Sequence, residues 1–198
     1  MDSADVSPLV DVQFPLRGRT LPRDHARALS HALRRAAPWL DRDGGAYGVR
    51  PVGLVAGTGA QALLSQRARL TLRVARAHGA ALAALEGADL DVDGHAVRLG
   101  RPVVHELLAH STLYAAVVVS EHADEAAFLD VQGRCICGRA QRLQGDDGPL
   151  AGYSLMVDRL STADSLTVQE RGLGPHRAFG CGLFVPHRSA AALNALTA

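Results

Sequence analysis

Apolar and polar residues alternate with a period of two along residues 10–16, which is the pattern of a strand with one buried face. After Pro22 the spacing changes, and Leu29 and Leu33, four positions apart, predict a helix that continues to about Ala37 and ends before Pro38. The same criteria predict strands at 51–55 and 70–74, an Ala-rich helix at 77–86 and a hairpin at 90–99. The order β-α-β-β-α-β is that of one ferredoxin-like module.

The second half of the chain shows the same order less clearly. Ser161 and Asp164 form a capping-box pattern that predicts a helix ending near Arg171. The other predicted elements are strands at 113–119, 134–138, 153–157 and 181–185, a helix at 124–131 and a loop at 144–148. With a boundary near Arg101-Pro102, the chain is expected to be an α+β protein with two tandem ferredoxin-like (RRM-like) modules, 1–101 and 102–198. The duplication is inferred from element order alone, because no repeat is visible at the residue level.

The composition is that of a globular protein, with 198 residues, 47% hydrophobic and 21% charged. No apolar run approaches the length of a membrane span, and residues 1–8 lack the features of a signal peptide, so we expect a cytoplasmic protein without a membrane partner. Three cysteines are too few for a disulfide framework, which agrees with a reducing compartment.

The charge pattern leaves nucleic-acid binding open despite a net charge of +1. All 21 basic residues are arginine, whose planar guanidinium matches phosphate better than an ammonium group does. A near-neutral protein can therefore bind RNA if its arginines share one face. Aromatic residues make up only 4% of the chain, so recognition through the backbone of a hairpin is favoured over base stacking.

Residues 172–182, GLGPHRAFGCG, contain two G-x-G pairs that form a glycine-rich loop. Their glycines are Gly172, Gly174, Gly180 and Gly182. Glycine has no Cβ, so it permits left-handed backbone and close approach of main-chain N–H groups to a bulky polar ligand such as a phosphate. His176 and Arg177 lie between the pairs, and Arg177 could add a charged contact to that phosphate. A tight turn into a last strand would use the same glycines.

The loop and the opening block together resemble the CRISPR-associated repeat-processing endoribonucleases of the RAMP superfamily. Residues 10–29, VDVQFPLRGRTLPRDHARAL, are similar to the first strand and helix of one subfamily, in which a proline, an aspartate and a histidine begin the helix. Residues 100–150 match by element order only. The resemblance implies cleavage of precursor CRISPR RNA within its repeats, without metal or cofactor. It also implies CRISPR repeat RNA as partner, with other subunits of a CRISPR effector complex as further candidates.

Cleavage without a metal requires a 2′-hydroxyl to attack the adjacent phosphate, with a general base and a general acid moving the protons. Histidine suits this task, and the chain has nine. The resemblance implies that the catalytic histidine lies in or beside the first helix and faces the glycine-rich loop. His25, in the PRDH block, is the first candidate and His31 the second. Since six helical positions place them about 120° apart, they are not expected to act as a pair. His25 could instead cap the helix.

Several arginines are candidate RNA contacts. They are Arg17, Arg19, Arg23, Arg69 and Arg73. The first three precede the first helix. Arg69 and Arg73 share one face of the strand at 70–74, which the alternation predicts to be exposed and which suits a repeat stem. An ordinary solvated sheet face would show the same pattern.

Other chemistries are less well supported. The spacing of Cys135 and Cys137 is not that of a zinc knuckle, even with Cys181. The G-x-G pairs precede a strand, unlike a dinucleotide fingerprint, and no phosphate-loop lysine motif or acidic two-metal cluster is present. Two alternatives to an enzyme remain. One is a catalytically inert RNA-binding subunit that caps the 3′ hairpin of the guide RNA, and the other is an unrelated ferredoxin-like regulatory domain.

Overall fold

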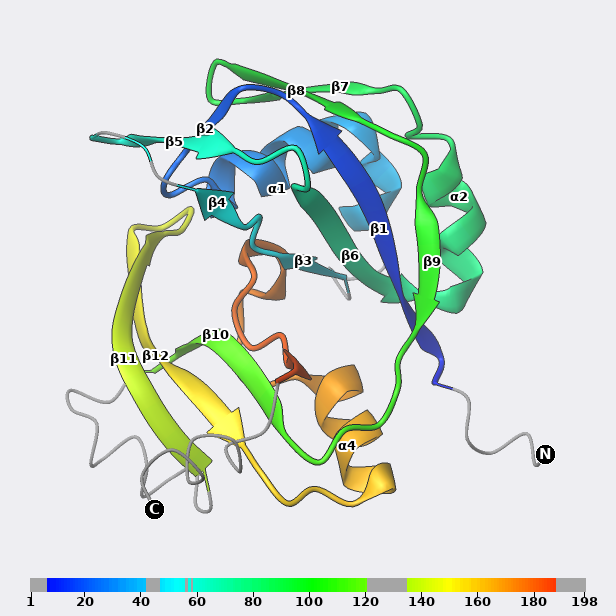
Figure 1. Ribbon diagram of the computed structural model, residues 1–198, viewed down its shortest axis with the longest axis vertical. Coiled ribbons are helices and arrows are strands. Elements are labelled where there is room, and N and C mark those ends of the chain that lie inside the picture. Colours follow the sequence, from blue (N-terminus) through cyan, green and yellow to red (C-terminus); the bar gives the residue numbers. More distant parts are fainter. Residues whose placement is uncertain (1–6, 42–46, 56, 58, 121–134, 188–198) are drawn as a thin grey trace.

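A computed structural model describes residues 7–41, 47–55, 57, 59–120 and 135–187 (Figure 1). These residues form a mixed α+β fold in which two larger antiparallel sheets, one in the upper and one in the lower half of Figure 1, lie against each other. A small third sheet lies beside the first. Its strands are β2 (Thr20–Pro22), β5 (Gln61–Leu64) and β4 (Leu54–Val55).

The first sheet is built around β1 (Leu9–Arg17), whose alternating pattern buries Val10, Val12 and Phe14 almost completely. Its strand order is β3-β6-β1-β8-β7, with β9 also paired to β1. These strands are β3 (Gly48–Arg50), β6 (Arg69–Ala75), β7 (Asp89–Val92), β8 (His95–Leu99) and β9 (Val103–Glu106). The helices α1 (Ala26–Ala36) and α2 (Gly79–Ala83) pack on one face of the sheet through a shared apolar core.

The second sheet has the order β11-β12-β10-β13. Its strands are β10 (Leu113–Val119), β11 (Cys135–Gln144), β12 (Pro149–Val157) and β13 (Val185–Pro186). The helix α4 (Thr162–Arg171) packs on it through Val168, beside a small core that contains Leu113 and Phe184. The predicted start of this helix is confirmed, because the Ser161 hydroxyl accepts a hydrogen bond from the Asp164 backbone N–H.

Several sequence predictions require correction in detail. The strand expected at 51–55 is two short strands, β3 and β4, on either side of Pro51, which cannot donate a ladder hydrogen bond. The helix expected at 77–86 is a 3₁₀ turn, η2 (Arg76–His78), followed by α2. The strand expected from Cys181 begins only at Val185, because the left-handed backbone of Gly182 interrupts the extended chain. The predicted helix at 124–131 lies outside the described residues.

The predicted boundary at Arg101-Pro102 falls between β8 and β9, two strands that both pair with β1. β8 pairs with β1 at Leu16 and Arg17, and β9 continues the same antiparallel pairing along residues 10–13. The chain therefore leaves the first sheet after β9, at Glu106. The division of the chain into two modules stays a prediction.

Candidate functional site

The glycine-rich loop is shaped by contacts within the protein. Leu173 N–H donates to Gly182 O (3.1 Å), and Gly182 N–H donates to Val117 O on β10 (2.7 Å). Gly182 has φ +65°, and a Cβ at this position would overlap the Leu173 carbonyl. Gly180 (φ +85°) is buried, with the place of its Cβ 2.9 Å from Val49 O. The close approach that these two glycines permit is thus made by the chain itself.

The other two predicted glycine contacts differ in exposure. Gly172 is half-buried and follows the last residue of α4, where its N–H donates to Val168 O. Gly174 is exposed, and the atom nearest to the place of its Cβ is Val119 O at 3.6 Å. Of the four glycines, Gly174 is the one whose surroundings leave room for a ligand.

A short 3₁₀ turn, η3 (Arg177–Phe179), carries the middle of the loop onto α1. The Phe179 ring is buried and lies 5.9 Å from the Arg34 guanidinium. The imidazole of His176, an exposed residue, is stacked on this Phe179 ring, with ring centroids 5.9 Å apart and planes inclined by 9°. The loop therefore presents one exposed ring beside the first helix.

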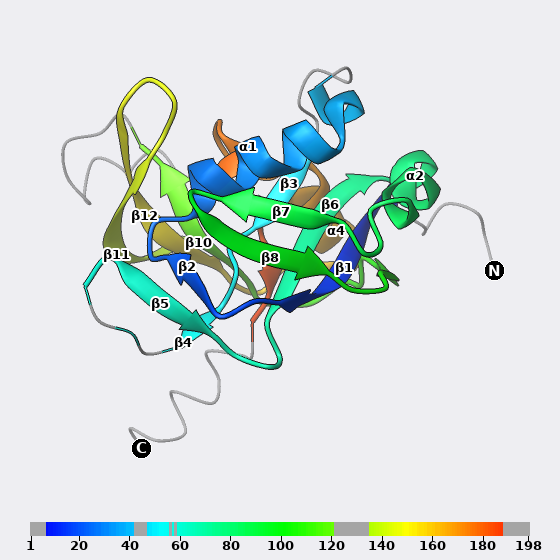
Figure 2. The same ribbon diagram turned by 90° about the horizontal axis from the view of Figure 1, so that it is seen from above.

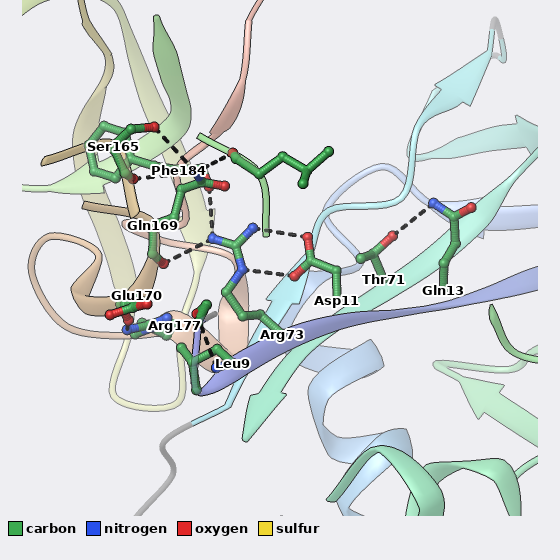
Figure 3. Close-up of polar contacts among 12 residues, drawn as sticks. Leu9, Asp11, Gln13, Thr71, Arg73, Ser165, Gln169, Glu170, Arg177 and Phe184 are labelled. Atoms are coloured by element: carbon green, nitrogen blue, oxygen red, sulfur yellow. Dashed lines mark hydrogen bonds and ion pairs between the residues drawn. The ribbon is translucent and has the colours of Figure 1, made fainter. Parts of the chain in front are cut away.

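Arg177 points inward, away from the exposed part of the loop (Figure 3). Its Nη1 donates to the carbonyl oxygens of Glu170 and Arg171 at the C-terminal end of α4. Its Nε and Nη2 are buried and have no hydrogen-bond partner among the described residues. Burial, followed by the nearby Arg73 charge, lowers the pKa of Arg177. The predicted phosphate contact is not available in this conformation, in which Arg177 caps a helix.

His25 precedes α1 and lies 5% exposed beneath the chain that leads from β3 to β4. Its Nε2 accepts a hydrogen bond from Val52 N–H (3.1 Å), so the ring proton is on Nδ1, which lies 3.1 Å from Pro22 O. Burial is the main cause of the lowered pKa of His25, which keeps the ring neutral. Both ring nitrogens are thus occupied by backbone groups, as expected for a structural residue.

His31 lies on the outer face of α1, and its Nε2 is 2.7 Å from Asp146 Oδ1. Asp146 belongs to the turn between β11 and β12, which lies beside the N-terminal end of α1 (Figure 2). A second contact holds the same turn, because Gln144 N–H donates to Asp24 Oδ2 (2.7 Å). Asp146 is the sole hydrogen-bond partner of the His31 ring among the described residues. Its Nδ1 is thus without a hydrogen-bond partner in the part of the chain that the structure describes.

His31 lines a cavity of about 670 Å³ between α1, the β7–β8 turn and the end of β11. Arg27 and Arg35 line it too, and both are exposed. Three carboxylates also border this cavity: Asp24, Asp91 and Asp93. The cavity thus combines a histidine with two guanidinium groups, which are suitable partners for a phosphate.

The same histidine is connected to the glycine-rich loop through Arg34. The second Asp146 oxygen lies 3.9 Å from Arg34 Nη1, and the Arg34 guanidinium in turn contacts the Phe179 ring. Arg34 Nε also donates to the Tyr47 hydroxyl (3.0 Å), which fixes the position of the guanidinium. His31 and the loop are therefore connected through a chain of side-chain contacts.

A second cavity of about 400 Å³ lies between the two sheets. His25, Arg23 and Gly180 border it from one side, and Tyr114 and Arg142 from the other. Arg23 is partly engaged, because its Nε donates to Gly59 O and its Nη2 to Gly57 O.

The open face of the first sheet carries a groove of about 400 Å³ with three exposed arginines. They are Arg50, Arg67 and Arg69. No carboxylate is among the residues that line this groove, and Pro51 borders both the groove and the cavity between the sheets. The two are thus adjacent, and together they make a basic surface that runs from the open sheet face to α1.

Arg73 corrects the expectation of an exposed strand face. It is 3% exposed and pairs with Asp11 through two hydrogen bonds of 2.8 and 3.0 Å. Its Nη1 donates to Gln169 O and Phe184 O of the second half (Figure 3). The alternation of polar and apolar residues in β6 predicts that Arg69 and Arg73 are both exposed. In the structure, the second sheet covers the end of the strand that carries Arg73 and leaves Arg69 at the other end exposed. Arg17 and Arg19 are exposed, outside the cavities described above.

The cysteines do not form a metal site within the described residues. Among those residues, no three His, Cys, Asp or Glu side chains come together as ligands for one ion. Burial raises the pKa of the Cys181 thiol to about 12, so it stays protonated at neutral pH.

Several residues of this region carry no pattern in the sequence that would link them to a site. Asp146 lies in the loop predicted at 144–148, and its pairing with a helix residue 115 positions earlier has no local signal. Arg50 and Arg67 lacked a pattern that linked them to Arg69. Arg35 lies near the end of the predicted helix, where an arginine can either line an RNA path or only solvate the helix end. The sequence pattern that does point to a site here is a histidine together with several arginines on one predicted helix.

Comparison with known proteins places these observations in a family. The family model described as Cas6 Crispr matches residues 10–189. The CRISPR-associated endonuclease Cas6 of Myxococcus xanthus (strain DK1622) is 35% identical over 195 residues, which cover 92% of this chain and 83% of that protein. The chain belongs to the Cas6 family.

Solved structures support the same fold at low sequence identity. A CRISPR associated protein Cas6 is similar with a TM-score of 0.64 at 9% identity, covering 91% of this chain and 100% of that one. A Cas6-related protein from Pyrococcus furiosus is similar with a TM-score of 0.55 at 10% identity, covering 89% and 98% of the two chains. No helix in the described part of this Cas6 family member has the length and apolar character needed to cross a membrane.

Proposed function

We propose that this chain is a metal-independent endoribonuclease that cleaves precursor CRISPR RNA within its repeats and holds the guide RNA it produces. Membership of the Cas6 family and the name of the Myxococcus xanthus relative, an endonuclease, support the reaction class. We place the enzyme in the cytoplasm, with the repeat RNA as its partner and other CRISPR effector subunits as further partners. Neither a metal nor a cofactor is part of the proposal.

The observation that carries the mechanism is the hydrogen bond of His31 with Asp146. With Nε2–H donated to the carboxylate, the imidazole is held in one tautomer and Nδ1 has a lone pair. Nδ1 accepts the proton of the 2′-hydroxyl as that oxygen attacks the adjacent phosphorus. The bond from phosphorus to the 5′-oxygen then breaks, and this oxygen takes up a proton from water, while the protonated His31 releases its proton to solvent, so the products are a 2′,3′-cyclic phosphate and a 5′-hydroxyl.

Arg27 and Arg35 line the same cavity and would bind the oxygens of the scissile phosphate as negative charge develops on them. His25 remains the other candidate from the sequence, but its ring nitrogens are both bound to backbone groups. We therefore assign the proton transfer to His31 and a structural role to His25.

The RNA path that we propose follows the exposed arginines. Arg50, Arg67 and Arg69 would bind backbone phosphates along the open face of the first sheet. The path then passes Pro51 and reaches Arg23 in the cavity between the sheets. Of the predicted loop contacts, we retain His176 and Gly174, which are exposed.

We also propose that the two larger sheets are tandem ferredoxin-like modules, divided near Arg101-Pro102. The strand orders β3-β6-β1-β8 and β11-β12-β10-β13 support this, since in each order the strand that comes first in the sequence lies between the third and the last. β9 follows the predicted boundary but is paired with β1 of the first sheet. The cavity that contains His31 is then formed by both modules.

The reaction type is tested with repeat RNA from the CRISPR array of the source genome. A single 2′-deoxy substitution at the nucleotide before the cut is expected to abolish cleavage and leave binding intact, and EDTA is expected to leave the rate unchanged. Cleavage of the deoxy RNA, or loss of cleavage in EDTA, would contradict the 2′-hydroxyl mechanism. A protein that binds the repeat but cuts no RNA would support the inert-subunit alternative.

A further inference from the structure

The backbone of the glycine-rich loop contains one residue that does not fit its neighbours. Five residues between 172 and 182 have positive φ angles, and four of them are the glycines. The fifth is His176, at φ +67° and ψ +34°. It follows Pro175, in a position where a turn of this kind favours glycine or asparagine. A side chain with a Cβ is strained in this conformation, so the presence of histidine at this position calls for an explanation.

The side chain at this position is presented to solvent. The imidazole of His176 is stacked on the Phe179 ring, with planes only 9° from parallel. Phe179 is 6% exposed and is held by its contact with the Arg34 guanidinium. One face of the imidazole is thus supported by a buried ring, while the residue as a whole stays exposed. A supported, exposed ring of this kind offers a π surface to a flat partner.

The position of this ring suggests the partner. Arg34 contacts Phe179 on one side and approaches Asp146, the partner of His31, on the other. An RNA whose scissile phosphate lies at His31 would therefore pass close to His176. Phosphates have other partners in the cavity of His31, namely Arg27 and Arg35, whereas an unpaired base next to the cut needs a stacking surface.

We propose that His176, supported by Phe179, is a stacking platform for an unpaired nucleobase adjacent to the cleaved phosphodiester. This inference rests on the proposed function, because it takes the RNA to be the substrate. The strained backbone orients the imidazole face for the base, and stacking of the base fixes the nucleotide for attack. His176 is thus a positioning residue, and the proton transfer remains with His31.

The test uses non-cleavable repeat RNA with a 2′-deoxy nucleotide at the cut and 2-aminopurine, whose fluorescence falls on stacking, at each neighbouring position in turn. The parent protein is expected to quench one of these positions. His176→Gly is expected to lose that quenching and to bind the RNA about five- to tenfold more weakly. Its Tm is expected to rise by about 2–4 °C, because glycine removes the backbone strain. His176→Phe, which keeps an aromatic face, is expected to retain the quenching.

The outcomes that would contradict the proposal can be distinguished from one another. Unchanged quenching and affinity in His176→Gly would overturn the proposal, and so would a fall in Tm accompanied by weaker binding, since the side chain would then be structural. A parent protein that cuts the repeat but quenches no 2-aminopurine would contradict the platform and leave the endoribonuclease intact. A parent protein that binds none of these RNAs would contradict both.

Discussion

His31 Nε2 and Asp146 Oδ1 lie 2.7 Å apart, although 115 positions separate the two residues in the sequence. The contact joins the first helix to the turn between β11 and β12, and Gln144 reinforces it by donating to Asp24. The candidate catalytic histidine is therefore oriented by the opposite half of the chain. We expect catalysis to require that the two halves keep this arrangement.

Arg73 should be the main polar contributor to the packing of the two sheets. Arg73→Ala would leave Asp11 and the carbonyls of Gln169 and Phe184 without their donor, so we expect the free energy of unfolding to fall by about 3 kcal/mol. Denaturant unfolding measures the change. Arg69→Ala, on the exposed end of the same strand face, is the matched control and should change it by less than about 0.5 kcal/mol. Equal effects of the two variants would show that Arg73 is not a buried contact.

His25 should make stability depend on pH in the acid range. Because burial lowers its pKa, the unfolded chain binds a proton near pH 6.5 while the folded chain does not. Its contribution to stability is complete above that pH and is lost as the pH falls below it, at up to about 1.4 kcal/mol per pH unit. Unfolding at pH 7.5 and 5.5 should show this loss, and the neutral variant His25→Gln should reduce it. An identical pH profile in both proteins would exclude His25 as the cause.

The arginine groove should contribute to RNA affinity through phosphate contacts. Arg67→Ala and Arg69→Ala are each expected to weaken binding to the repeat and to reduce the slope of log affinity against log salt by about one. Fluorescence anisotropy over a series of salt concentrations gives both values. Arg98→Ala, an exposed arginine beside Asp89 in the first sheet, should leave the slope unchanged. If all three variants behave alike, the RNA does not follow this groove.

Local patterns predicted most of the elements that hold the site. The period of two in β1, the Leu29 and Leu33 spacing of α1, and the Ser161 cap of α4 depend on neighbours within a few positions, so the sequence reveals them. The positive φ angles of the four loop glycines were anticipated for the same reason.

Contacts between distant segments were not predictable. Arg73 is predicted to face solvent because polar and apolar residues alternate along its strand, and only the packing of the second sheet against the first buries it. His25 ranked above His31 by motif, since nothing local shows that Val52 N–H and Pro22 O occupy its nitrogens. Arg177 lies in a loop suited to phosphate, yet it caps α4. In each case the deciding partner comes from a segment that the pattern around the residue does not specify.

The comparison of His31→Ala with His25→Gln in single-turnover cleavage of the repeat RNA tests the central claim most directly. General acid–base catalysis contributes about 10²–10⁴-fold, so His31→Ala should lower the rate by that factor with RNA affinity preserved. His25→Gln should cleave at the parent rate under conditions in which it is folded. A His31→Ala protein that cleaves as fast as the parent, with His25→Gln inactive though folded and bound to RNA, would contradict the assignment.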